Sequence, residues 1–81
     1  MKVYYFEMTD TYGGESNYSW VHRFKVEAKS FHGALCKLSR EVGYNFKKTY
    51  DNRWDAKNAC ICLFDISDDE YGIQEYSFKS I

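Results

Sequence analysis

The hydrophobic period of the chain changes from two residues to 3.6 residues at Ser30, and this change constrains the fold more than any other feature. Residues 18–28 alternate between apolar and polar side chains, which predicts a strand with one face on a core. Ser30 is a favourable N-cap, because its hydroxyl accepts a hydrogen bond from a free amide of a new helix. Gly43 suits the left-handed position that ends a helix. The apolar stripe of this predicted helix consists of Phe31, Ala34, Leu35, Leu38 and Val42.

Three further segments have strand-like patterns. Residues 2–9 alternate and lie one connection before residues 18–28, so we expect these two segments to form an antiparallel hairpin. Residues 59–66 are nearly all apolar, which is typical of a central strand that is covered on both faces. Residues 73–81 alternate again and predict one more strand.

The segments between these elements are polar or irregular. We expect a polar loop at residues 10–17, an irregular connection with room for a short strand or a turn of helix at 44–58, and a turn at 67–72. The predicted fold is one α+β domain over residues 1–81, with an antiparallel-rich four-stranded sheet and one helix packed on one face. Its element order is β-β-α-β-β. A β-grasp arrangement has the same order, and the sequence does not choose between the two.

Size and composition favour a small cytoplasmic domain. The 81 residues are 44% hydrophobic and 20% aromatic, so a core can be built from large rings. No secretory signal is recognisable and the three cysteines are an odd number, so we expect a reducing, cytoplasmic setting without disulfides. No stretch approaches the roughly 20 apolar residues that cross a bilayer, so we expect no membrane partner.

Charge is segregated along the chain although the net charge is only −1. Residues 29–57 carry seven bases and three acids, whereas residues 58–81 carry one base and five acids. These charges either solvate the surface or form two binding patches, one of which imitates nucleic-acid phosphate. The candidate partner-binding residues are the bases Lys37, Arg40, Lys47, Lys48 and Arg53 and the acids Asp68, Asp69 and Glu70.

No catalytic, cofactor or metal motif is recognisable in the sequence. Cys60 and Cys62 are too close for the loop that wraps a structural zinc ion, and Cys36 lies off the apolar stripe of the helix. The sequence does not place a cysteine next to a histidine for nucleophilic catalysis. Gly13-Gly14 lacks the lysine and the following helix of a phosphate-binding loop. We therefore expect a protein that is not an enzyme and that has no cofactor, no metal and no catalytic residue.

Nucleic-acid binding is an alternative, because aromatic side chains alternate with the bases in the middle of the chain. The sequence pI of about 6.1 is low for a dedicated nucleic-acid binder, and no aromatic RNA-binding motif is present. The aromatic residues that alternate with the bases are Tyr44, Phe46, Tyr50 and Trp54.

A third possibility is a dimer formed through an edge strand.

The predicted layout resembles that of small phage-encoded proteins, among them anti-CRISPR proteins, some of which are β-β-α-β-β. In residues the resemblance covers about 24–42, where Val26-Glu27-Ala28-Lys29-Ser30 enters a short helix that contains alanine and leucine. The resemblance implies a phage protein in the host-cell cytoplasm that inhibits a CRISPR or other defence complex by stoichiometric binding. Its partner would be a host protein or ribonucleoprotein complex. Apart from the resemblance, we expect the protein to be a monomer or a weak homodimer. No individual contact residue follows from the resemblance.

Overall fold

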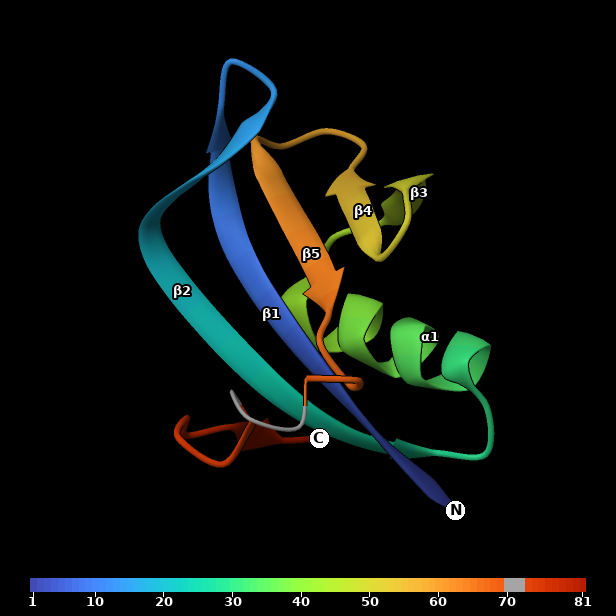
Figure 1. Cartoon of the computed structure of the whole chain (residues 1–81). Helices are drawn as coiled ribbons and strands as arrows, with labels where there is room; N and C mark the ends of the chain where they lie inside the picture. The colour runs from blue at the N-terminus through green and yellow to red at the C-terminus, as the bar shows by residue number, and fades with distance from the viewer. Residues whose placement is uncertain (70–72) are drawn as a thin grey trace.

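A computed structural model describes residues 1–69 and 73–81, and within them a six-stranded sheet carries one helix on one face (Figure 1). The strand order is β3-β4-β5-β1-β2-β6, and all neighbouring pairs are antiparallel except β2 and β6. The α+β class is therefore confirmed, but the prediction of four strands in a β-β-α-β-β layout is wrong. The elements are β1 (Lys2–Tyr12), β2 (Glu15–Ala28), α1 (Phe31–Val42), β3 (Phe46–Tyr50), β4 (Arg53–Ala56), β5 (Ile61–Asp65) and β6 (Lys79–Ser80).

The predicted hairpin of the first two strands is confirmed, but its strands extend through most of the expected loop at residues 10–17. Only Gly13 and Gly14 separate them, with φ of +61° and +84°. Two successive positive φ angles are typical of the tight turns that match the twist of a hairpin, and glycine adopts them without steric cost. The polar composition of this segment indicated a loop, whereas the glycine pair is what ends one strand and starts the next.

Asp10 organises an irregularity in this hairpin. The pairing of β1 with β2 shifts between Thr9 and Thr11, so that Asp10 lies at a bulge. Its carboxylate accepts hydrogen bonds from the Ser19 hydroxyl at 2.6 Å, the Asn17 amide at 2.8 Å and the Ser19 backbone N–H at 2.9 Å. These donors, the Ser19 hydroxyl first, hold the pKa of the Asp10 carboxyl well below its usual range.

The helix α1 forms where the sequence predicts it. The Ser30 hydroxyl accepts a hydrogen bond from the Gly33 N–H at 3.1 Å, and Gly43 has φ +81° and donates its N–H to the Ser39 carbonyl. Ala34 and Leu38 are fully buried against the sheet. Phe31 begins the packing, because its ring contacts Tyr4, Phe6 and Trp54 at centroid distances of 5.8, 5.7 and 5.1 Å.

Within the described residues, no helix is long and apolar enough to cross a membrane.

The predicted irregular connection at 44–58 is a second hairpin, formed by β3 and β4. A register shift between Lys48 and Tyr50 interrupts the alternation, which explains why the pattern looked weak in sequence. The turn residue Asp51 has φ +41°, a conformation that aspartate adopts more readily than most residues. β4 then pairs with β5, which lies between β4 and β1. Cys62 and Leu63 alternate along β5 and are both fully buried, so the prediction of a strand covered on both faces is confirmed there.

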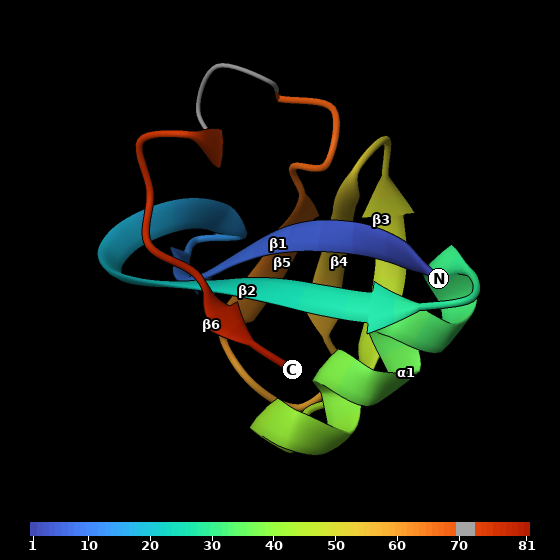
Figure 2. The ribbon, with the colours of Figure 1, turned by 90° about the horizontal axis from the view of Figure 1, so that it is seen from below.

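The predicted strand at 73–81 is wrong for most of its length, since only Lys79–Ser80 pairs, in parallel, with Phe24 and Lys25 of β2. The preceding residues cross the face of the sheet opposite α1 (Figure 2). The Tyr76 ring lies 3.6 Å from the Arg23 guanidinium, and the Phe78 ring lies 5.0 Å from that of Tyr5. Most of this segment is thus held on the sheet by side-chain contacts, whereas the alternation of its residues predicted backbone pairing with a neighbouring strand. Of the predicted turn at 67–72, residues 70–72 lie outside the described part of the chain.

Candidate binding surface

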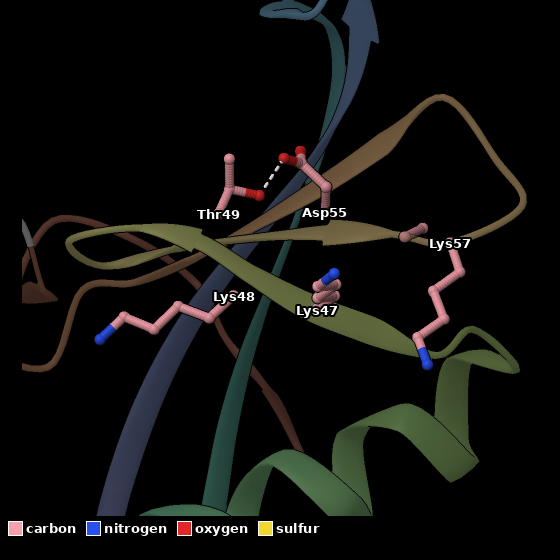
Figure 3. Close-up of a pocket in the computed structure, with 6 residues that line it drawn as sticks. Lys47, Lys48, Thr49, Asp55 and Lys57 are labelled. Carbon is pink, nitrogen blue, oxygen red and sulfur yellow. Dashed lines mark hydrogen bonds between the residues drawn. The ribbon is translucent and has the colours of Figure 1, made fainter.

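Three lysines gather around the outermost strand, β3, and we call Lys47, Lys48 and Lys57 the basic edge. Lys47 and Lys48 belong to β3, and Lys57 follows β4 directly. Together with Thr49, Asp55 and Ala56 they line a shallow hollow (Figure 3). The register of the hairpin explains the arrangement, because Lys47 pairs with Asp55 and Lys48 with Trp54. Successive residues of a strand point to opposite faces, so the two lysines surround the edge from both sides.

The positive charges of the basic edge are spread rather than focused. The side chains of Lys48 and Lys57 extend away from each other (Figure 3), and the Lys48 ammonium lies 5.7 Å from the centre of the Trp54 ring. No ion pair joins any of the three lysines to an acid within the described residues. The nearby carboxylate of Asp55 instead accepts hydrogen bonds from Arg53 and from the Thr49 hydroxyl. The lysines are therefore available to an external anionic partner.

Arg53 is a correction to the predicted set of outward bases. It is only 5% exposed, and its guanidinium donates to the Asp55 carboxylate at 2.9 Å, the Tyr50 hydroxyl at 3.1 Å and the Gly14 carbonyl at 2.8 Å. Burial opposes its charge, but the Tyr50 hydroxyl and the Asp55 carboxylate raise the pKa of Arg53 overall. Arg53 ties the β3–β4 hairpin to the tip of the first hairpin and does not belong to the basic edge.

Two further predicted bases lie on α1 and differ in their surroundings. The Lys37 ammonium donates to the Glu27 carbonyl at 2.6 Å, which attaches it to the end of β2. Arg40 is exposed and lines a groove between α1 and the start of β3, where Lys57 is also a lining residue. The structure therefore brings Arg40 toward one end of the basic edge and leaves Lys37 elsewhere.

The predicted acidic set lies in a different part of the surface. Asp68 and Asp69 are exposed and line a hollow with Asn52, Asp65 and Ile66, next to the turn of the β3–β4 hairpin. The Asp65 carboxylate accepts hydrogen bonds from Ser67, whose hydroxyl and backbone N–H both donate to it. Glu70, the third predicted acid, lies outside the described residues.

Two of the four aromatic side chains that alternate with the bases are unavailable for stacking. Trp54 is only 9% exposed, and Phe46 packs against the core cluster. Tyr44 and Tyr50 retain larger exposed fractions of 36% and 54%. The basic edge therefore presents cations without a continuous aromatic platform.

The sequence patterns did not predict two features of this region, the position of Lys57 and the contact between His32 and Cys36. Lys57 was counted among the bases but not among the contact residues, because only the pairing of β3 with β4 brings it beside Lys47. His32 and Cys36 are in contact on α1, and their spacing of four residues on a predicted helix could have indicated it. In the part of the chain that the structure describes, no group of three or more histidine, cysteine or acidic side chains could hold a metal ion.

No protein-family model, curated protein or solved structure matches the chain at a significant level.

Proposed function

We propose that this chain is a non-enzymatic binding protein that engages an acidic partner surface through the basic edge. The single observation that carries the proposal is the set of three lysines around the outermost strand, none of them neutralised by an ion pair among the described residues. Lysines without an ion-pair partner attract an acidic surface over a distance of about a Debye length, roughly 8 Å at physiological salt.

The spread of the lysines supports a broad partner rather than a small ligand. Lys48 and Lys57 extend in different directions (Figure 3), so their ammonium groups do not converge on one anion in this structure. A partner that presents several carboxylates along an extended surface can pair with each lysine separately. Such complementarity contributes mainly to the association rate and to the choice of partner.

An acidic protein surface fits better than nucleic acid. Proteins that bind single strands combine cations with exposed rings on which bases stack. Here Trp54 and Phe46 are committed to the core and only Tyr44 and Tyr50 of these four rings are exposed, so the cations lack a continuous platform. Pairing of β3 with a second copy of itself is also disfavoured, because it brings Lys47 and Lys48 close to the same lysines of the other chain.

The biological setting that we propose is inhibition of a host CRISPR or other defence complex by stoichiometric binding. The support for it is the resemblance to phage-encoded inhibitors in residues 24–42, where the strand enters the helix; the four-stranded layout that belonged to the resemblance is not the observed one. A charged binding edge is the feature that such a mechanism needs, and it requires no catalytic group.

The test compares two variants that carry the same change in charge. Lys47→Glu/Lys48→Glu reverses the basic edge, and Lys2→Glu/Lys29→Glu reverses two exposed lysines at the far end of the first hairpin. Each protein is expressed in bacteria with an active CRISPR system, and plaques of a targeted phage are counted. We expect wild type and the Lys2/Lys29 variant to restore plaques and the Lys47/Lys48 variant to fail. If none of the proteins restores plaques, the proposed setting is wrong.

Direct nucleic-acid binding is tested separately by a gel shift with a short DNA duplex and a single strand. Binding to phosphate would weaken steeply as salt is raised. We expect no shift at physiological salt. A shift that the Lys47/Lys48 variant abolishes would replace the acidic protein by nucleic acid as the partner.

A further inference from the structure

A groove between α1 and the start of β3 contains the one thiol that contacts a histidine within the described residues. Cys36 and His32 lie on α1, one helical turn apart, and the Cys36 Sγ is 3.6 Å from the His32 Nε2. Both side chains are exposed. The groove is lined by apolar, neutral polar, thiol, imidazole and cationic side chains, among them His32, Leu35, Cys36, Arg40, Phe46 and Lys57.

An imidazole and two cationic side chains surround the Cys36 thiol. An imidazole at this distance can act as the base that removes the proton of a thiol while the thiol attacks. Arg40 is one turn further along α1 and Lys57 faces the same groove from the end of β4. No acidic side chain of the described residues lines this groove. The thiolate, and not the thiol, is the form of cysteine that acts as a nucleophile.

The other two thiols lack this environment and serve as internal references. Cys62 is fully buried, and burial raises the pKa of its thiol, with Asp55, Asp10 and Glu7 adding to the increase and Arg53 opposing it. Cys60 is exposed, but no histidine contacts it in the described part of the chain. Among the described residues, the chain therefore has one exposed thiol in contact with a histidine, one exposed thiol without such a contact and one protected thiol.

We propose that Cys36 is a modification site that forms a mixed disulfide with small anionic disulfides. The Cys36 thiolate attacks one sulfur of the reagent, so that a new S–S bond forms and the S–S bond of the reagent breaks. The other half of the reagent leaves as a thiolate, and the proton held by His32 passes to that thiolate when it is basic enough and otherwise to water. The disulfide is the oxidant, because the leaving sulfur takes the electron pair of the broken S–S bond. Arg40 and Lys57 attract the carboxylates of the reagent into the groove. This reactivity is independent of the proposed binding function.

The first experiment measures which cysteine reacts. The folded protein is treated with less than one equivalent of dithiobis(nitrobenzoate), a disulfide that carries carboxylates, and the modified residue is located by mass spectrometry. We expect Cys36 to react about tenfold faster than Cys60, because Cys36 has an imidazole within reach as a general base. Cys62 should react only after unfolding. Equal rates for Cys36 and Cys60 would overturn the proposal.

The second experiment tests the roles of His32 and the cations on a Cys60→Ser background, so that Cys36 is the only exposed thiol. His32→Gln should slow the reaction about tenfold at neutral pH, and the deficit should vanish at alkaline pH, where the thiol ionises without help. The groups that face Cys36 in this titration are His32 and Arg40 on α1 and Lys57 beyond β4. A deficit that is unchanged at alkaline pH would show a merely structural effect and contradict the proton transfer.

The third experiment compares reagents of opposite charge. Arg40→Gln should slow the anionic reagent and accelerate cystamine, which carries ammonium groups, whereas Lys29→Gln, a control at an exposed lysine outside the groove, should change neither rate. If Arg40→Gln affects both reagents equally, the groove does not select anions and that part of the proposal is wrong.

Discussion

Replacing Arg53 by methionine is expected to destabilise the protein through the loss of one buried hydrogen-bonding centre. The guanidinium connects the Asp55 carboxylate, the Tyr50 hydroxyl and the Gly14 carbonyl, and its side chain is 6% exposed. A hydrogen bond to a charged group contributes about 1.5–3 kcal/mol, and removal of one partner of a fully buried ion pair costs about 3–5 kcal/mol. Because Asp55 retains 33% exposure, water can replace part of the lost interaction. We therefore expect a loss of about 2 kcal/mol in the free energy of unfolding.

Urea and thermal unfolding followed by circular dichroism measure this loss. For a domain of this size, 2 kcal/mol corresponds to a decrease of roughly 10 °C in Tm. Arg40→Met is the matched control, because Arg40 is exposed, and we expect it to change stability by less than about 0.5 kcal/mol. If Arg53→Met is as mild as Arg40→Met, the guanidinium does not hold the two hairpins together and Arg53 returns to the candidate binding residues.

Two further predictions concern local structure. Ser30→Ala should lower the free energy of unfolding by about 1 kcal/mol, because the Gly33 N–H loses its acceptor, while Ser30→Asp should preserve stability; equal losses in urea unfolding would contradict the cap. Asp10→Asn should reduce the acid sensitivity of the fold. The pKa of Asp10 is lower in the folded protein than in the unfolded chain, so its contribution is present above the unfolded value of about 4 and is lost as pH falls through the folded value. The stability of wild type should therefore decline more below pH 4 than that of Asp10→Asn, and parallel pH profiles would refute this role.

The parts of the fold that sequence predicted are those encoded by neighbouring residues. Ser30 and Gly43 act on amides and carbonyls within one helical turn, so the bounds of α1 follow from local chemistry. The β3–β4 hairpin was missed because the bulge near Thr49 breaks the alternation on which strand prediction depends. The alternation of residues 73–81 suggested a strand, but a strand also needs a partner edge, and β2 pairs with only two residues of this segment.

The candidate site was only partly predictable for a related reason. The accumulation of bases in residues 29–57 is visible in the sequence, and two of these bases, Lys47 and Lys48, are exposed on β3. The burial of Arg53 depends on the carbonyl of Gly14, which is distant in sequence and approaches only because the first hairpin is long. The membership of Lys57 likewise depends on strand pairing. Such long-range placement is set by the topology of the sheet, which sequence periodicity does not report.

An NMR titration of the protein with an extended polyglutamate peptide tests most directly whether the basic edge is the binding surface. We predict that the largest changes in amide chemical shift occur in Phe46–Tyr50 and at Lys57, that they are absent from Lys47→Glu/Lys48→Glu, and that they persist in Lys2→Glu/Lys29→Glu. Shift changes that centre on another surface, or that are equal in the two variants, would contradict the claim.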